Sequence, residues 1–190
     1  MAWFTSYSCA RMDTRWHLLI YTVPAQPSRK RAAIWREVKK VGAEYLRDGV
    51  CILPERADTL KSLRAIAASV EAFEGEGTVV ESAELPGQRS EAVVARFQAA
   101  RAEEYGEIAR EAERLLEHIA RETEHRDFTY PELEELEQDL TKLKRWADQV
   151  RARDYFKSPA AQTVTDVLER CDHALEAFLD TTAEAQTAAQ

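Results

Sequence analysis

The first part of the chain alternates between short apolar runs and amphipathic segments. The run WHLLIYTV, residues 16–23, is continuous and rich in β-branched and aromatic side chains, which predicts a buried strand. Residues 28–42 predict an amphipathic helix, with Ser28 suited to cap its start and Gly42 suited to end it. The apolar positions of that helix recur at helical spacing: Ile34, Val38 and Val41.

Two short apolar runs follow and flank Asp48-Gly49, a dipeptide that favours a hairpin turn. Residues 57–77 predict a second helix, and residues 78–85 predict a last strand. The inward positions of the second helix are Leu60, Leu63, Ile66, Ala67 and Val70. The resulting order, β-α-β-β-α-β, predicts an α+β domain of ferredoxin-like type over residues 15–86, with two helices on one face of a four-stranded antiparallel sheet.

Beyond that domain the pattern becomes helical, and residues 87–180 predict a three-helix bundle or coiled-coil hairpin. Pro131 suits the start of the second of these helices, and Ser158 suits the cap of the third. The three apolar stripes are Val94, Phe97, Ile108, Leu115 and Ile119; Leu133, Leu136, Leu140, Leu143, Ala147 and Val150; and Val164, Leu168, Cys171, Leu175 and Phe178. We expect residues 1–14 to form an N-terminal extension and residues 181–190 to form a frayed tail.

The distribution of charge differs between the two predicted parts of the chain. The 190 residues carry a formal net charge of −8, yet residues 12–54 hold eight Lys/Arg against four Asp/Glu. Residues 84–190 hold fourteen Lys/Arg against twenty-four Asp/Glu. A basic unit followed by an acidic one indicates nucleic acid or another polyanion as the partner of the basic end.

The chain contains neither a membrane-length apolar run nor a secretory signal pattern, and its three cysteines are widely spaced. An odd, scattered set of cysteines is typical of reduced thiols, so we expect a cytoplasmic protein without a membrane segment. The common metal, nucleotide and redox motifs are missing from the sequence, so we expect no cofactor and no enzymatic activity.

The cations of the basic unit concentrate in the first predicted helix. They are Arg29, Lys30, Arg31, Arg36, Lys39 and Lys40. Most project away from the apolar stripe, and three lie in the first turn, where exposed cations cost roughly 0.3–1 kcal/mol each against the helix dipole. A bound oxyanion would offset that cost and would use the free N–H groups of the turn. The alternative is a solubilising face that pairs with glutamate-rich helices, in the same chain or another.

Several other residues are candidates for chemistry. His118, Glu122 and His125 share one helix at metal-ligand spacing, although a solvated charged face explains them more simply. A redox role is conceivable for Cys51, because thiols can be oxidised. A cysteine in an apolar strand is more commonly a small hydrophobic side chain, and the same interpretation applies to Cys171 on the apolar stripe of its helix. Two aromatics, Trp35 and Tyr45, suit stacking on bases, but their positions favour packing at the rim of the sheet.

The stretch LLIYTVPAQPSRKRAAIWREVKKVGAEYLRDGVCILPE, residues 18–55, resembles the N-terminal region of the ChrB-type chromate-resistance regulators. The predicted domain is also similar to the Cas2-like, ferredoxin-like domain of the phenylacetate repressor family, which commonly dimerises. The resemblance implies a cytosolic regulator that binds the promoter of chromate-resistance genes as a homodimer. Longer members of the family continue into a separate C-terminal domain, so chromate sensing by this chain stays open.

Our first functional hypothesis is therefore a DNA-binding regulator in which the six cations of residues 29–40 contact phosphates. Chromate is a tetrahedral dianion that would suit the same helix start, and the sequence does not decide between the two. The rival is a non-enzymatic module that dimerises, binds a protein and lacks an effector domain. A chromate-reducing enzyme has the least support because a thiol pair is missing, and a Cas2-type nuclease is disfavoured because the first strand ends in IYTVPA, without a carboxylate.

Overall fold

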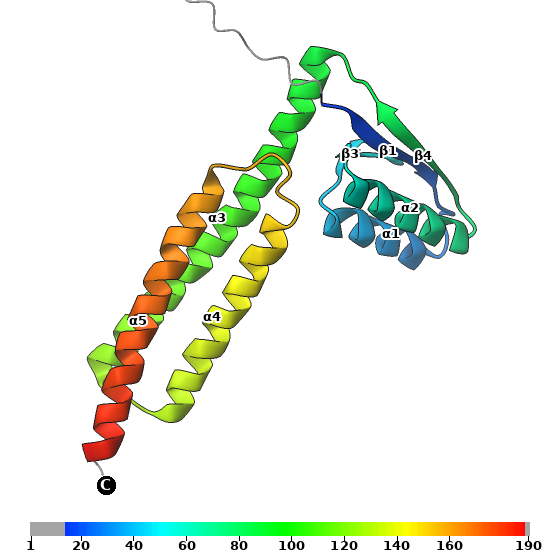
Figure 1. The fold of residues 1–190 in the computed structure, drawn as a ribbon. Helices are drawn as coiled ribbons and strands as arrows, with labels where there is room; N and C mark the ends of the chain where they lie inside the picture. Colours follow the sequence, from blue (N-terminus) through cyan, green and yellow to red (C-terminus); the bar gives the residue numbers. More distant parts are fainter. Residues whose placement is uncertain (1–13, 189–190) are drawn as a thin grey trace, which may run out of the picture. The chain divides into compact units, whose positions relative to one another are not determined.

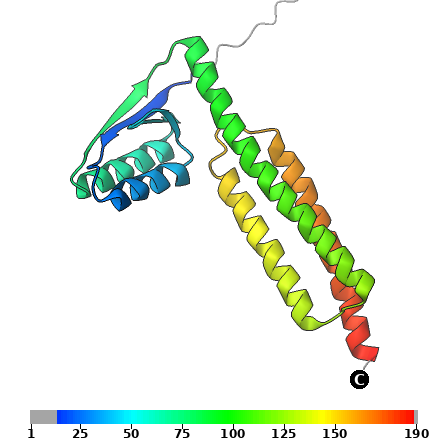
Figure 2. The same cartoon turned by 180° about the vertical axis from the view of Figure 1, so that it is seen from behind.

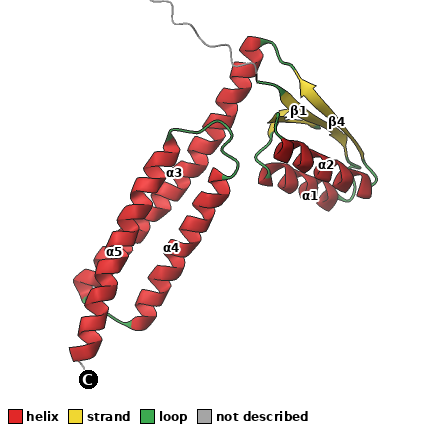
Figure 3. Cartoon of the chain, viewed as in Figure 1, coloured by secondary structure: helices red, strands yellow, loops and turns green. Residues whose placement is uncertain are grey.

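The structure, a computed structural model, describes residues 14–188. Within this range the chain is a mixed α/β protein with a four-stranded antiparallel sheet and five helices, and most of its residues are helical (Figures 1 and 3). The chain divides between Arg96 and Phe97 into two compact units, each of which is described by itself. The predicted extension, residues 1–14, lies outside the described residues except for its last position.

The first unit contains the sheet and two helices, in the predicted order of element types. Its elements are β1 (Trp16–Thr22), α1 (Ser28–Lys40), β2 (Glu44–Arg47), β3 (Val50–Pro54), α2 (Ala57–Ala72) and β4 (Glu76–Ala83). The strands follow the order β2-β3-β1-β4 across the sheet, and each neighbouring pair is antiparallel. In the centre of the sheet, Leu19 of β1 pairs with Cys51 of β3 on one side and with Val79 of β4 on the other.

Helices α1 and α2 cover the same face of this sheet (Figures 1 and 2). The approach of α2 is close at Gly77 of β4, where an added Cβ would lie 3.3 Å from Ala67. The fully buried side chains of this layer are Leu19, Ile34, Val38, Cys51, Leu53, Leu63 and Val70. Each large apolar side chain buried in this way contributes roughly 1.5–3 kcal/mol of transfer free energy, so the core fixes which faces of α1 and α2 point outward.

Helix α1 ends as predicted and begins one residue earlier than predicted. At its C-terminus Gly42 has a φ of 70°, and the Ala43 N–H donates to the Val38 carbonyl at 3.2 Å. This 6→1 hydrogen bond is typical of a Schellman motif and confirms Gly42 as the stop. The prediction of Ser28 as the N-cap is wrong: Pro27 holds that position in an extended conformation, and Ser28 is the first helical residue.

The β2–β3 hairpin turns at Asp48-Gly49, which confirms that prediction. Arg47 pairs with Val50, so the loop has two residues, and Gly49 has a φ of 71°. The Gly49 carbonyl also accepts a hydrogen bond from the Tyr21 N–H at 2.7 Å. A Cβ at Gly49 would lie 2.5 Å from the Tyr21 carbonyl oxygen, so both the turn and this close approach require glycine.

The first turns of α3 (Gly87–His125) belong to the first unit. The buried indole N–H of Trp16 donates to the Ser90 hydroxyl at 3.1 Å, and Arg96 donates to the Tyr45 carbonyl. Val93 is buried here, whereas the predicted Val94 is only partly buried. These first turns of α3 pack on the rest of the first unit. The side of the helix that they bury can therefore differ from the side that the helix buries in the second unit.

The second unit contains the rest of α3, α4 (Tyr130–Arg151) and α5 (Ala160–Ala188). Successive helices run in opposite directions and pack side by side (Figures 1 and 2). They share one apolar core: Tyr105, Ile108, Ala112, Leu115, Ile119, Leu133, Leu136, Leu140, Ala147, Val150, Val164, Val167, Leu168, Cys171 and Phe178. The three predicted stripes supply most of these positions, while Leu143 and Leu175 are only partly buried at its margin.

The sequence predicted the start of α4 correctly, but it did not predict the start or the C-terminal end of α5. Thr129 caps α4 by accepting a hydrogen bond from the Glu132 N–H at 3.4 Å, and proline lies in the first turn as expected. The prediction of Ser158 as the cap of α5 is wrong, because its buried hydroxyl makes no hydrogen bond with the described residues. Helix α5 continues to Ala188 with Thr182 buried, so it occupies most of the segment that we expected to be frayed.

Within residues 14–188, none of the helices is both long enough and apolar enough to span a membrane.

Candidate nucleic-acid interface

Helix α1 presents its cations because its apolar side faces the sheet. Ile34 and Val38 are fully buried, and the helix has no acidic residue in its first turn and no side-chain cap at its N-cap. At about 100° per residue, Arg29, Arg36 and Lys40 fall within about 40° of one another on the side opposite Ile34. Lys39 lies beside them, and all four side chains are exposed. We call Arg29, Arg36, Lys39 and Lys40 the basic face.

Lys30, which the sequence grouped with these cations, has a different environment. Its ammonium lies 2.7 Å from a carboxylate oxygen of Glu74 and donates to the Phe73 carbonyl at 3.2 Å. Both acceptors follow the end of α2, where the last carbonyls of a helix attract a cation. The hydrogen bond from Lys30 lowers the pKa of Glu74. Lys30 therefore joins α1 to the end of α2 and is not free to meet a ligand.

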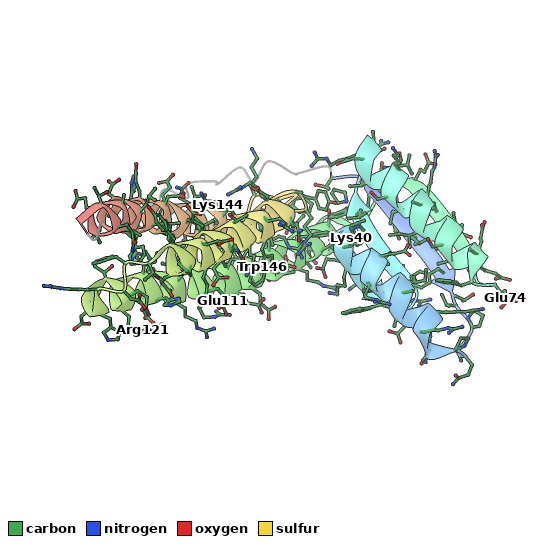
Figure 4. The ribbon with its side chains drawn as sticks, turned by 90° about the horizontal axis from the view of Figure 1, so that it is seen from below. Lys40, Glu74, Glu111, Arg121, Lys144 and Trp146 are labelled. Carbon is green, nitrogen blue, oxygen red and sulfur yellow. The ribbon has the colours of Figure 1, made fainter. Side chains whose placement is uncertain are left out.

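The remaining cations have few partners. Arg36 donates from Nε to the Ala32 carbonyl of its own helix at 3.2 Å, which leaves the rest of its guanidinium in solvent. Arg29, Arg31, Lys39 and Lys40 have no ion-pair or hydrogen-bond partner for their side chains among residues 14–188. Within the first unit, the carboxylates therefore do not neutralise these four side chains. Lys40 lies at the C-terminal end of α1 (Figure 4).

A pocket of about 500 Å³ lies beside the basic face, at the edge of the sheet. We call it the aromatic pocket; its lining residues are Tyr21, Val23, Arg31, Trp35, Tyr45, Asp48 and Gly49. The hydroxyls of Tyr21 and Tyr45 are 2.8 Å apart, and burial raises the pKa of both phenols, so both stay neutral. Trp35 lines this pocket and is 53% exposed, so much of its ring stays open to solvent at the rim of the sheet. The pocket therefore combines one unpaired guanidinium with three aromatic rings.

The cysteines behave as apolar side chains. Cys51 is buried in β3, and burial raises the pKa of its thiol to about 12. Cys171 is buried in α5, where burial raises the pKa of its thiol to about 11, and its Sγ lies 3.4 Å from the Ala112 carbonyl oxygen. A thiol reacts as its thiolate, so neither environment favours redox chemistry. This agrees with the structural role that the sequence favoured for both.

The histidine cluster is assembled differently from the sequence pattern. His118 and Glu122 do face one another on α3, with 3.4 Å between His118 Nε2 and a Glu122 oxygen. His125 is exposed and does not join them. The third member is Glu132 of α4, which has an oxygen 3.3 Å from the same His118 nitrogen. Sequence reasoning missed Glu132 because its contact depends on how α3 and α4 pack.

The protein is thus a mixed α/β chain that has an exposed basic helix and an adjacent aromatic pocket. The family model described as "Protein ChrB, N-terminal" matches residues 31–188, which is most of the chain. The chain belongs to this family, and the resemblance drawn from residues 18–55 is confirmed.

One curated relative is Protein ChrB of Cupriavidus metallidurans, which is 33% identical over 63 residues. Those residues cover 33% of this chain and 19% of that protein, so the match spans about a fifth of the relative's length. No solved structure matches the chain.

Proposed function

We propose that this protein is a DNA-binding regulator of chromate resistance that contacts phosphates through the basic face of α1. Membership of the ChrB family supports the regulatory part of this proposal. The observation that carries the DNA part is the set of exposed, unpartnered side chains of Arg29, Lys39 and Lys40 on one helix of a chain with net charge −8. In an acidic protein, such a local excess of cations is best explained by an anionic partner.

The dimensions of the basic face fit a phosphate backbone. From Arg29 to Lys40 the helix rises by about 16 Å, at about 1.5 Å per residue. Successive phosphates of one DNA strand are about 3.4 Å apart along the axis, so this rise corresponds to about five of them. Contacts of this kind position a protein on DNA without reading the sequence. Selectivity for a promoter would come from a second reader or from the second subunit of a dimer.

The aromatic pocket lies next to these contacts and differs from them in chemistry. Arg31 can hold a phosphate, and the exposed ring of Trp35 offers a surface on which a base can stack. The same pocket would also accept a compact oxyanion such as chromate beside Arg31. DNA phosphate has the stronger support because the free cations extend along the helix and are not confined to the pocket.

We also propose that the first unit is a ferredoxin-like domain that forms a homodimer. The order β2-β3-β1-β4 with antiparallel pairing supports the first part. Ile20 supports the second part, because it follows the buried Leu19, points to the opposite face of the sheet and is 46% exposed. For the second unit we propose a coiled-coil type of bundle, on the basis of its three apolar stripes.

The test is fluorescence-anisotropy binding of the purified chain to the DNA upstream of its own gene and to a scrambled duplex of the same composition. Measurements at low and at physiological salt, each with and without chromate, separate the alternatives. Tight, salt-sensitive binding that favours the upstream fragment supports the proposal. Release by chromate would add sensing to it, while equal binding to both duplexes would reduce it to a generic basic surface.

The alternative is a non-enzymatic module that dimerises and binds a protein partner. Ile20 favours it as much as it favours a DNA-bound dimer. Light scattering that shows a dimer, together with a lack of affinity for either duplex even at low salt, would select this alternative.

A further inference from the structure

Three side chains that commonly bind metals meet at one end of the α3–α4 pair. His118 and Glu122 are four residues apart on α3 and therefore lie on one face of that helix. Glu132 comes from the first turn of α4, where Thr129 fixes its backbone by accepting the Glu132 N–H. One ligand atom from each residue, the His118 nitrogen and two carboxylate oxygens, lies within 4.8 Å of the other two.

Two of the three separations match those of a tetrahedral metal site. Zinc binds histidine nitrogen and carboxylate oxygen at about 2.0–2.1 Å, so two ligands of a tetrahedral ion are about 3.3–3.4 Å apart. The His118 Nε2 atom is 3.3 Å from the Glu132 oxygen and 3.4 Å from the Glu122 oxygen. The histidine nitrogen is therefore at ligand spacing from both carboxylates, and the third pair, the two carboxylate oxygens, lies within 4.8 Å.

The burial of the carboxylates also points to an ion. The Glu122 and Glu132 side chains are 13% and 19% exposed, respectively. The Glu132 oxygen that faces His118 is itself buried and accepts no hydrogen bond from the described residues. Burial is the main cause that raises the pKa of Glu132, with Glu122, Glu135 and Asp127 adding negative charge around it. A buried carboxylate without a hydrogen bond is costly unless a cation compensates it.

We propose that His118, Glu122 and Glu132 bind one divalent transition-metal ion of the Zn²⁺ type and so fasten the start of α4 to α3. The ion would take three protein ligands and keep one position for water. This site shares no residue with the basic face, so the metal proposal can be tested separately from DNA binding.

Two neighbouring groups oppose or compete with this ion. Arg121 Nε lies 3.1 Å from the same Glu122 oxygen, but its side chain is 57% exposed and can swing into solvent. A protonated His118 could also bridge the two carboxylates without any metal. The two occupants differ in the state of the ring: a metal requires neutral imidazole, whereas the metal-free bridge requires imidazolium.

The test uses the full chain after treatment with a chelator, titrated with ZnCl₂ at pH 7.5 by calorimetry, and the thermal midpoint with and without Zn²⁺. We expect one ion per chain and a higher midpoint with zinc. His118→Ala and Glu132→Gln should each weaken the affinity at least tenfold, whereas the control Arg121→Ala should retain or strengthen it.

Circular dichroism of each variant without metal separates loss of binding from loss of fold, and the near-isosteric Glu132→Gln is the variant expected to keep the fold. All proteins compared carry Cys9→Ser, so that this thiol does not contribute to the measured zinc binding. Equal zinc binding by the wild-type chain and both ligand variants would overturn the proposal. So would an absence of binding by the wild-type chain.

Discussion

Removal of three cations from the basic face provides a quantitative test of phosphate binding. The triple variant Arg36→Ala, Lys39→Ala, Lys40→Ala changes exposed side chains that make no ion pair among the described residues. Each phosphate contact adds about 0.9 to the negative slope of log affinity against log salt. If Arg29 and Arg31 contribute as well, five contacts give a slope of about −4.5 per chain, and the triple variant keeps about −1.8.

These slopes predict a large difference in salt response. Between about 50 and about 200 mM salt, the affinity of the wild-type chain for duplex DNA should fall roughly 500-fold, and that of the variant roughly 12-fold. The assay is fluorescence anisotropy with a labelled duplex across that range. Stability should change by no more than about 0.5 kcal/mol, because these are surface positions, and urea unfolding checks this.

The matched control is the triple variant Lys142→Ala, Lys144→Ala, Arg151→Ala. It removes the same charge from the second unit, where the three cations pair with Asp139, Asp172 and Asp148. We expect its salt slope to equal that of the wild-type chain. Equal losses of slope in both triple variants would mean that net charge governs binding, and the reasoning about the basic face would be wrong.

Three further predictions concern the fold. Gly49→Ala should destabilise the first unit by about 1–3 kcal/mol in urea unfolding, because its φ is positive and the added Cβ meets backbone; an unchanged midpoint would contradict this. In a Cys9→Ser background, native Cys51 and Cys171 should resist iodoacetamide at pH 8.5, since their thiol pKa values are about 12 and about 11 and deprotonation begins only at higher pH; rapid native labelling of either would contradict that burial. Leu136→Ala, at a fully buried position, should cost about 2–5 kcal/mol, and a cost below about 1 kcal/mol would show that the bundle core is not packed as described.

Sequence patterns predicted the features that depend on neighbouring residues. The Gly42 stop and the Asp48-Gly49 turn are local, since a positive φ favours glycine wherever the chain lies. The apolar stripe of α1 was also predictable, because helical periodicity alone places Ile34 and Val38 on the buried side. These features were enough to expect an exposed set of cations on α1.

Features that depend on distant residues were not predictable. Lys30 looked like the other cations of its helix, yet it pairs with Glu74, 44 residues away, because α1 packs beside the end of α2. Glu132 replaces His125 beside His118 for the same kind of reason. The cap assignments of Ser28 and Ser158 failed because a suitable residue type does not fix the backbone at which a helix begins.

The most direct test of the basic face is a footprint of lysine reactivity on the DNA-bound protein. The chain is acetylated with and without duplex DNA, and modification at each lysine is measured by mass spectrometry. The account predicts that DNA protects Lys39 and Lys40, while Lys61, Lys142 and Lys144 react equally in both states and Lys30, paired with Glu74, changes little. Protection of the second-unit lysines with Lys39 and Lys40 unchanged would contradict the account.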